Sequence, residues 1–383
     1  MRRKLALITE IISPYRIPVF NALARHENID LQVIFLAETD PTQRQWLVYK
    51  EQIQFSYRVL PSWRRRVKGR NLLLNWGLRR ALRQFSPDTI VCGGYNYLAS
   101  WVALAWARRH AVPFLLWSES TAKDTRPGHS LIEWLKSRFV NGCRGFVVAG
   151  RSSFEYVQSF GIRRDAIFTA PNAVDNDFFS TQAQAARRDA PALRRKLNLP
   201  ERYFVFVGRL IREKGVLELL QAYAALPAAT RERFGLVFVG DGPVRAELEA
   251  RADAIQLGTI KFTGFAHREQ LAIYYGLAEA LVFPTYTDPW GLVVNEAMAC
   301  ALPIVCSRDA GCVADLVEDH WNGRLVMQKD SKQLSAVLAE LAANSEVRVS
   351  MGSHSRERIR QFSPEACAAG MAGAVLACAG SNG

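Results

Sequence analysis

Two carboxylates stand eight positions apart in the stretch DPWGLVVNE, at Asp288 and Glu296, shortly after the apolar run EALVFP. Ionised carboxylates only accept hydrogen bonds, so such a pair suits a ligand that presents neighbouring hydroxyl groups. The spacing places Asp288 before a turn and Glu296 about one helical turn inside the helix that follows. The alternative is that both acids only stabilise a helix N-terminus, where negative charge is favourable.

A cationic segment follows an earlier apolar run. After YFVFV comes GRLIREKG, which contains Gly208, Arg209 and Lys214. The arginine supplies a planar fork of donors and the lysine a mobile point charge, and together they are suited to neutralising a diphosphate. Surface Arg and Lys are common, so this segment gains its significance from the motifs around it.

Glycines end several of the later apolar runs. The segments GDGP, TGF and RDAGC contain Gly240, Gly264 with Phe265, and Gly311. Glycine at a strand end permits close backbone approach to a ligand, and a helix N-terminus near Gly311 offers free N–H groups to phosphate. Each glycine alone could simply turn the chain, but together we expect them to line one rim.

Short apolar runs alternate with longer helical patterns, which is typical of parallel sheets covered by helices. A first series (KLALIT, DLQVIF, TIVC, PFLLW, GFVVA) is separated from a second (YFVFVG, GLVFVG, IKFTG, ALVFP, PIVC) by a polar, Arg- and Ala-rich stretch. A chain of 383 residues is long enough for two domains. We predict an α/β protein with a doubly wound domain at 1–180, a linker at 181–199, a second such domain at 200–360, and a C-terminal helix at 361–383 that packs back toward the first domain.

Composition indicates a soluble enzyme, with 49% hydrophobic and 22% charged residues. The apolar run LALIT is too short for a secretory signal, and LASWVALAWA is about half the length of a membrane span. The seven cysteines are scattered without Cys-x-x-Cys spacing, which favours a reducing compartment. We therefore expect the protein in the cytoplasm.

The net charge of +13 is concentrated in the first half, where residues 1–180 hold 26 Lys and Arg against 14 Asp and Glu. Residues 58–83 contain nine basic side chains and no acidic one. Such a block suits a polyanion, either nucleic acid or an anionic membrane surface. The alternative is an amphipathic helix from Leu74 to Phe85 whose basic face only meets water. The residues that we expect to dock on a membrane surface are Arg64, Arg65, Arg66, Lys68 and Arg70.

The ordered motifs GRLIREKG, GDGP, FTGF and FPTYTDPWGLVVNEAMACALPIV, preceded by PNAVD, resemble the family-four retaining glycosyltransferases of GT-B fold over roughly residues 165–325. The N-terminal SPYRIPVFNAL is consistent with this but less specific. The resemblance implies two Rossmann-like domains facing across an interdomain cleft, the first binding the acceptor. It also implies metal-independent transfer of a hexose from a nucleotide diphosphate sugar, preferably a UDP-sugar, to a glycan or lipid-linked saccharide in cell-surface polysaccharide or glycolipid synthesis of bacterial type.

The resemblance also assigns roles to the residues singled out above. Asp288 would contact donor-sugar hydroxyls, Glu296 the nucleotide ribose, and Arg209 with Lys214 the diphosphate. Glu119, in WSES, stands where some relatives bring a polar side chain to the reacting centre. The backbone cradle and the other donor-binding positions would be Gly208, Gly240, Gly264, Phe265, Trp290, Gly291 and Leu292.

Two departures from the family pattern stand out. Asp288 is one methylene shorter than the usual Glu, which alters the geometry of the sugar contact. Ala301 replaces a common Gly, which we interpret as a packing change. Retention needs either a covalent intermediate or front-face attack, and the sequence leaves both open.

Several other functions compete with this interpretation. A nucleotide-sugar epimerase or a phosphorylase would share the fold. The DND at 175–177 matches a metal-binding Asp-x-Asp, but it continues PNAVD without further features of that class, so we expect no metal and no cofactor. A nucleic-acid partner is not expected, because only Trp63 and Trp76 accompany the basic block and no binding signature is present.

Overall fold

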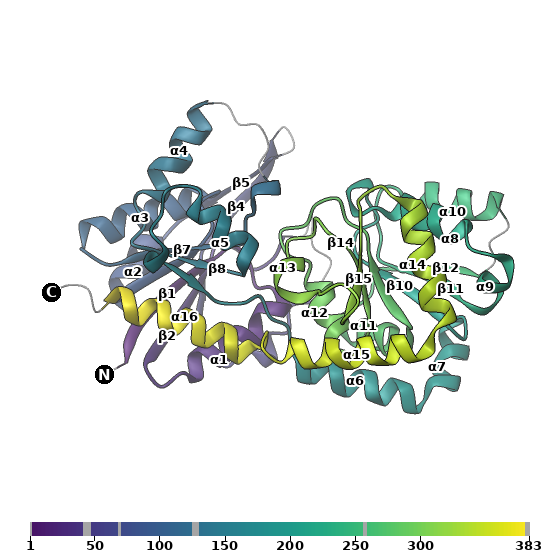
Figure 1. Ribbon diagram of the computed structural model, residues 1–383. Helices are drawn as coiled ribbons and strands as arrows, with labels where there is room; N and C mark the ends of the chain where they lie inside the picture. Colours follow the sequence, from purple (N-terminus) through teal and green to yellow (C-terminus); the bar gives the residue numbers. More distant parts are fainter. Residues whose placement is uncertain (1, 41–46, 68–69, 125–129, 256–258, 380–383) are drawn as a thin grey trace. The chain divides into compact units, whose positions relative to one another are not determined.

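The chain forms two compact units, each with its own parallel sheet (Figure 1). Unit 1 comprises Met1–Val174 and Ser363–Gly383, and unit 2 comprises Asp175–Phe362. Both are α/β units of Rossmann-like design, which confirms the predicted fold class. The computed structural model describes residues 2–40, 47–67, 70–124, 130–255 and 259–379.

Unit 1 is built on a parallel sheet of seven strands in the order β3-β2-β1-β6-β7-β8-β9. The strands are β1 (Arg3–Thr9), β2 (Ile29–Phe35), β3 (Ser56–Val59), β6 (Thr89–Gly93), β7 (Phe114–Ser118), β8 (Gly145–Val148) and β9 (Ile167–Thr169). The strand order reverses at β1, which pairs with β2 on one side and β6 on the other. In doubly wound sheets, ligands bind beyond the carboxyl ends of the strands at such a point.

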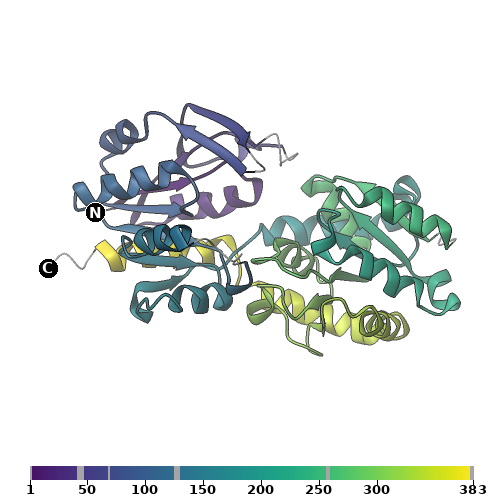
Figure 2. The same ribbon diagram turned by 90° about the horizontal axis from the view of Figure 1, so that it is seen from above.

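Helices cover both faces of this sheet, as Figure 2 shows from above. Successive side chains of a strand point to opposite faces. Accordingly, Leu5 and Leu7 of β1 belong to one buried apolar cluster, and Ala6 and Ile8 belong to another. The helices of unit 1 are α1 (Ile17–Arg25), α2 (Leu78–Phe85), α3 (Leu98–Arg109), α4 (Ser130–Val140), α5 (Arg151–Gln158) and α16 (Pro364–Ala379).

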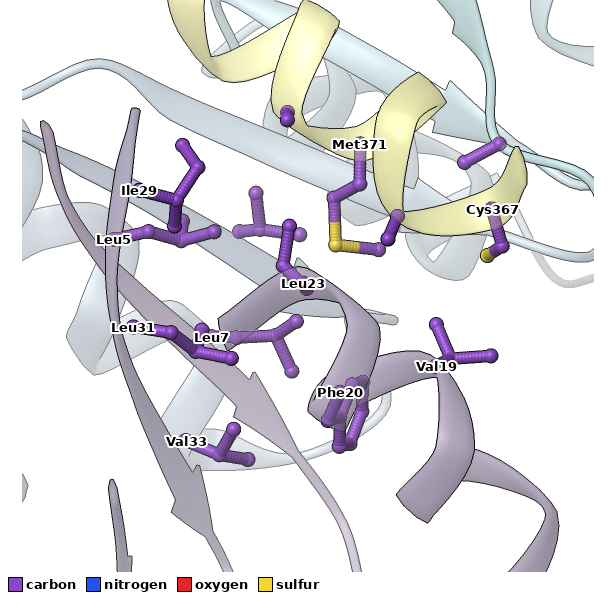
Figure 3. Close-up of a cluster of buried hydrophobic side chains, with 14 of the residues drawn as sticks. Leu5, Leu7, Val19, Phe20, Leu23, Ile29, Leu31, Val33, Cys367 and Met371 are labelled. Carbon is purple, nitrogen blue, oxygen red and sulfur yellow. The ribbon is translucent and has the colours of Figure 1, made fainter. Parts of the chain in front are cut away.

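The last helix, α16, completes the core of unit 1. Figure 3 shows Cys367 and Met371 of this helix beside α1, near Val19 and Leu23, and all four side chains are buried. Among the described residues, the helical stretch Ser345–Ala379 is long and apolar enough by length and composition to cross a membrane. Its apolar part is α16, whose buried side chains pack inside unit 1.

Unit 2 contains a parallel sheet of six strands in the order β12-β11-β10-β13-β14-β15. These are β10 (Tyr203–Val207), β11 (Gly235–Val239), β12 (Ile260–Gly264), β13 (Ala280–Phe283), β14 (Ile304–Ser307) and β15 (Gly323–Val326). Its helices are α6 (Asn176–Arg188), α7 (Ala190–Leu197), α8 (Val216–Ala224), α9 (Ala228–Arg233), α10 (Arg245–Ala254), α11 (Arg268–Leu277), α12 (Leu292–Ala299), α13 (Val313–Leu316), α14 (Ser331–Ala343) and α15 (Ser345–Ile359). The strand order reverses between the paired strands β10 and β13, so the loops after these two strands start side by side.

The predicted linker at 181–199 is wrong. This segment belongs to α6 and α7, and unit 2 begins at Asp175. Phe179, Ala183 and Ala186 are buried on α6, which packs on α11 and α12. The Arg- and Ala-rich composition therefore reflects the exposed face of amphipathic helices and not a flexible connection. The unit boundaries shift accordingly, from residue 180 to 174 and from 360 to 362.

The amphipathic helix expected from Leu74 onward begins only at Leu78, as α2. The preceding residues form a strand, β5 (Arg70–Asn75), which pairs in antiparallel fashion with β4 (Ser62–Val67). Gly77, with φ at 83°, turns the chain between β5 and α2. An apolar run of three leucines fits either a helix or a strand, and pairing with β4 decides in favour of the strand.

Candidate active site

Lys214 and Asp288 meet at the switch point of unit 2. Lys214 ends the 3₁₀ turn η5 (Arg212–Lys214) after β10, and Asp288 lies on the loop after β13. The Lys214 ammonium forms an ion pair with Asp288 Oδ2, and each side chain is 18% exposed. The other oxygen, Oδ1, accepts a hydrogen bond from the backbone N–H of Trp290 at 3.0 Å. Two residues that the resemblance assigns to different parts of a ligand are thus direct partners.

Backbone hydrogen bonds fix the position of Asp288. The N–H of Tyr286 and the hydroxyl of buried Thr285 both donate to the carbonyl of Glu213, at 2.8 and 3.2 Å. From the other side, the N–H of Gly311 donates to the carbonyl of Asp288 at 2.9 Å, so it is not free for phosphate as we predicted, and the next helix, α13, begins only at Val313. The loops after β10, β13 and β14 therefore hold one another, and Asp288 lies where they meet.

Glu296 lies on α12, and its carboxylate Oε2 accepts a hydrogen bond from the Tyr275 hydroxyl of α11 at 2.8 Å. Burial raises the pKa of Glu296 from its usual 4.5 to about 7, although the hydrogen bond from Tyr275 acts in the opposite direction. Burial, together with the charge of Glu296, raises the pKa of Tyr275 well above its usual value, so Tyr275 stays a donor. Near neutral pH the Glu296 carboxyl group is therefore divided between its protonated and ionised forms.

The turn into α12 is built around Gly291, whose φ is 90°. A Cβ at this position would lie 2.7 Å from the Phe283 ring, so both the backbone conformation and the space require glycine. The indole of Trp290 is 4% exposed, and its N–H donates to the side-chain oxygen of Asn295 at 2.8 Å. The Trp290 side chain is thus a structural anchor, whereas the amides from Leu292 onward open α12 and present the positive end of a helix.

Three of the predicted glycines lie together at neighbouring strand ends. Gly208 donates its N–H to the carbonyl of Val239 at 3.0 Å, and Gly240 donates to the carbonyl of Gly264 at 2.8 Å. Gly240 has a φ of 138°, and a Cβ there would lie 1.9 Å from the Gly208 carbonyl oxygen. Only glycine lets the ends of β10, β11 and β12 approach so closely. Phe265 follows directly on β12 and is 43% exposed.

Arg209 extends from the same loop as Lys214 but is exposed. Within the described part of the chain, no hydrogen bond or ion pair engages its guanidinium. Its neighbour Arg212, by contrast, pairs with Glu247 at 2.6 Å. Arg209 is therefore a guanidinium next to Gly208 that can receive an anion without giving up a partner among the described residues.

In unit 1, Glu119 follows β7 and forms an ion pair with Arg16, which follows β1. Arg16 is buried, and its guanidinium lies 4.1 Å from the centre of the Trp117 ring and donates to Asn172 Oδ1 at 3.1 Å. Burial lowers the pKa of Arg16, and the Glu119 carboxylate balances the buried positive charge. The Glu119 side chain is 41% exposed, so this ion pair has one buried and one accessible member.

The acids of the DND segment lie at the start of α6. Asp175 is the N-cap of α6 and accepts a hydrogen bond from the N–H of Phe178 at 2.9 Å, while Asp177 is exposed. Over the described residues, no group of three or more His, Cys, Asp or Glu side chains is arranged to hold a metal ion. The Asp-x-Asp pattern is thus explained by a helix start.

Sequence reasoning missed Tyr275 and Asn172, and it considered Arg16 only as the last residue of the first strand-to-helix loop, Glu10 to Arg16, a candidate acceptor-binding segment. Tyr275 is one of two consecutive tyrosines on an apolar helix face, a pattern that indicates only core packing. Asn172 lies in the PNAVD motif, and Arg16 lies in SPYR, so both stood within noted segments. Their contact could not be read from the chain, because 156 positions separate them.

Solved structures with similar folds place both units in one class. The crystal structure of Anabaena HepE in complex with UDP and glucose matches with a TM-score of 0.75 at 16% identity, covering 98% of this chain and all of that one. Sucrose-phosphate synthase from Thermosynechococcus elongatus matches with a TM-score of 0.71 at 21% identity, covering 97% and 98% of the two chains. The fold is that of the GT-B glycosyltransferases.

Sequence families describe both parts of the chain. Residues 20–178 match "Glycosyltransferase Family 4" and residues 189–358 match "Glycosyl transferases group 1". The chain belongs to the group 1, family-four glycosyltransferases, which confirms the resemblance noted in the sequence.

Characterised relatives match part of the chain. O-antigen chain mannosyltransferase B of Escherichia coli is 30% identical over 181 residues, which cover 44% of this chain and 46% of the relative. D-inositol 3-phosphate glycosyltransferase of Xylanimonas cellulosilytica is 32% identical over 225 residues, which cover 57% and 52%. The chain thus spans about half the length of the curated relatives it matches.

Proposed function

We propose that this protein is a retaining glycosyltransferase that moves a hexose from a nucleotide diphosphate sugar, a UDP-sugar, to a glycan or lipid-linked saccharide in cell-surface polysaccharide or glycolipid synthesis. The observation that carries the proposal is the cluster at the switch point of unit 2. There the paired Lys214 and Asp288 occupy the strand-end loops that also carry Arg209 and lead into the helix of Glu296. Two of the relatives, a mannosyltransferase and an inositol-phosphate glycosyltransferase, support transfer chemistry of this kind.

Breaking the bond between the sugar and the diphosphate places growing negative charge on the leaving group. Preorganised cations and N–H donors stabilise such charge best. Arg209, Lys214 and the first amides of α12 supply them from adjacent strand-end loops. Both retaining routes, through a covalent intermediate or by front-face attack, need this stabilisation on the side of the leaving group.

The two acids suit the remaining parts of such a donor. An ionised Glu296 can accept hydrogen bonds from the two ribose hydroxyls while Tyr275 holds its other oxygen. Asp288 is held by Lys214 and by the Trp290 N–H, so it contacts the sugar from a fixed position and aligns the ammonium at the same time.

We also place the enzyme in the cytoplasm, with unit 1 at the cytoplasmic face of the membrane, where a lipid-linked acceptor is available. All seven cysteines are free thiols, which suits a reducing compartment. Cell fractionation under low salt should recover the protein with the cytoplasm and the inner face of the membrane. Recovery from an oxidising compartment with paired cysteines would contradict this placement.

The direct experiment is a thermal-shift screen against nucleotide sugars, followed by turnover with the best ligand. A ligand that binds only the folded state raises the unfolding temperature, and UDP-sugars should give the largest rise. NMR of the product should show that the anomeric configuration of the donor is kept. Release of nucleoside diphosphate without an acceptor would instead indicate an epimerase, and release of a sugar phosphate in the presence of inorganic phosphate would indicate a phosphorylase.

Metal independence is a further expectation. Because Arg209 and Lys214 bring the positive charge that a leaving diphosphate needs, activity should persist in EDTA. Turnover measured before and after chelation tests this. Activity that disappears with EDTA and returns with Mn²⁺ would contradict it and would require a metal ligand set that the DND segment does not offer as folded.

Asp288→Glu tests the unusual first acid. Glu is the common residue of the family at this position, but the longer side chain must fit against Lys214 and the Trp290 N–H. We expect activity to be retained within about tenfold, since one extra methylene in a partly exposed site costs on the order of 1 kcal/mol. A dead but folded enzyme would show that the site has been rebuilt around the shorter side chain.

Glu119 is proposed to bind the acceptor. Arg16 fixes its position, and the accessible carboxylate can accept a hydrogen bond from an acceptor hydroxyl. Glu119→Gln keeps the size of the side chain and removes its charge, so we expect the KM for the acceptor to rise at least tenfold while donor binding by thermal shift stays unchanged. Equal loss of donor binding, or unchanged acceptor kinetics, would assign Glu119 a structural role.

A further inference from the structure

Figure 1 shows β4 and β5 of unit 1 side by side as a hairpin. The two faces of this hairpin carry chemically different side chains. In its register, Arg64 is opposite Leu73 and Trp63 is opposite Leu74, and adjacent residues of a strand point to opposite faces. Leu73 is 2% exposed and belongs to the core of unit 1. The face that carries Arg64 and Leu73 is therefore the inner face, and the face with Trp63 and Leu74 is the outer one.

The inner face ties the hairpin to the carboxyl end of the main sheet. Arg64 pairs with Glu10, which follows β1, at 3.1 Å and with buried Asp40 at 2.6 Å. At the base of the hairpin, the Asn75 side chain donates to the carbonyl of Leu36, which follows β2. The hairpin is thus fixed beside the strand ends where the acceptor is proposed to bind.

These contacts correct the predicted basic surface. Arg64 is 13% exposed in its ion pairs, so its charge is neutralised inside unit 1 and does not face a partner. Arg65 is exposed on the outer face, as predicted. Lys68 and the side chains of Arg66 and Arg70 lie outside the described residues.

The outer face of the hairpin carries exposed apolar side chains, whereas the charge of Arg64 is paired on the inner face. Trp63 is 43% exposed and Leu72 is 44% exposed, and Leu72 is the cross-strand partner of Arg65. Trp76, just beyond β5, is 55% exposed. The outer face of a hairpin is normally polar, because it meets water. Here it carries Trp63, Arg65, Leu72 and Leu74, and the exposed Trp76 follows β5 directly.

Charge and shape together define what this face fits. No acidic residue occurs between residues 52 and 87, and α2, the next helix along the chain, exposes Arg79, Arg80 and Arg83. Indole rings prefer the level of lipid headgroups, and arginine binds phosphate with its planar fork. A protein partner would need a complementary surface that is both acidic and apolar. An anionic bilayer has phosphate charge and apolar acyl chains over its whole surface.

We propose that the outer face of the β4–β5 hairpin docks on an anionic phospholipid bilayer, with Trp63, Leu72 and Trp76 in the headgroup region and Arg65 at the phosphates. The proposal rests on the proposed function in one respect, that a lipid-linked acceptor lies at this surface. It differs from purely electrostatic attachment, because the apolar side chains add binding that salt does not screen.

Vesicle flotation at two salt concentrations tests the proposal. Full-length protein should float with vesicles of phosphatidylglycerol and phosphatidylcholine in 0.1 M NaCl, and a part of it should remain bound in 0.5 M NaCl. Pure phosphatidylcholine should bind at least tenfold less. The double variant Trp63→Ser, Leu72→Ser keeps every charge, so it should lose the salt-resistant part, whereas Arg65→Gln should lose mainly the part that salt removes.

Val349→Ser is the matched control, since Val349 is 74% exposed on α15 of unit 2, far from this hairpin in the sequence. It should float like the wild type. Flotation of the double variant like the wild type at both salt concentrations, equal loss in Val349→Ser, or no flotation of the wild type would overturn the proposal.

A parallel thermal-shift measurement with nucleotide sugars separates this proposal from the proposed function. The hairpin variants should keep the donor-induced shift of the wild type, which also shows that they are folded. If the wild type floats as described but binds no nucleotide sugar, the proposed docking surface would be supported and the proposed transferase function would be contradicted.

Discussion

Replacing Lys214 by alanine is expected to lower kcat about 30- to 1000-fold. The ammonium lies next to the proposed diphosphate position, and loss of one preorganised charge contact in a transition state costs on the order of 2–4 kcal/mol. The substitution also leaves the Asp288 carboxylate, 18% exposed, without its ion-pair partner, so some stability should be lost with it. Steady-state kinetics and thermal unfolding of the same preparation measure the two effects.

The two effects can be separated with a second substitution. Lys214→Ala combined with Asp288→Asn removes the unpaired charge, so it should recover stability but not kcat. Arg209→Ala is the complementary case: its guanidinium has no partner within the described residues, so kcat should fall while the unfolding temperature stays the same.

Arg212→Ala serves as the matched control for charge. Arg212 lies in the same turn as Lys214 but pairs with Glu247 at the surface. Its removal should change neither kcat nor donor binding by more than about twofold, because exposed ion pairs contribute little. A loss in Arg212→Ala equal to that in Arg209→Ala would mean that the net charge of the loop matters and that no specific contact exists.

Most strands of both parallel sheets could be predicted, because parallel strands buried on both faces read as continuous apolar runs, whereas the edge strands β3, β9 and β15 were not predicted. YFVFV and GLVFV, now β10 and β11, are examples in which every residue is buried. The hairpin could not be predicted in the same way. Its strands are half exposed and carry arginines, and only the pairing of β4 with β5 distinguishes them from the start of a helix.

The sequence predicted which residues belong to the candidate site, but not which of them contact one another. Glycines and charged residues at strand ends marked the positions of Gly240, Arg209 and Asp288. That Lys214 binds Asp288 across 74 positions depends on the neighbouring places of β10 and β13 in the sheet, which sequence order does not state. Arg64 is a second example. The sequence predicted its charge on the surface, but the fold places Glu10 and Asp40 against it.

Glu296→Gln is expected to change stability and donor binding in opposite directions. Burial raises the pKa of Glu296 to about 7, above its usual 4.5, so the folded state holds this proton more tightly than the unfolded chain. Stability from this group is therefore greatest at low pH and declines as pH rises from about 4.5 to 7. A shift of this size corresponds to on the order of 1–3 kcal/mol once partial exposure of the carboxyl group is allowed for.

Glutamine is neutral at every pH and still accepts the Tyr275 hydrogen bond, so the variant should lose this decline. Urea unfolding should show it to be more stable than the wild type at pH 8 and nearly equal at pH 5. Donor affinity should follow the opposite course. In the wild type it should rise as pH increases through about 7, because the ionised carboxylate is the better acceptor for ribose hydroxyls.

The variant should bind UDP-sugar at least tenfold more weakly at pH 8, with a flat pH profile. Tyr275→Phe provides the matched comparison, since it removes the hydrogen bond that favours ionisation and leaves the carboxyl group in place. The pH at which donor affinity rises should therefore move upward in Tyr275→Phe. Two results for Glu296→Gln would contradict this role: donor affinity equal to that of the wild type, or the same decline of stability with pH. In that case Glu296 does not bind the donor, and its raised pKa reflects only its packing.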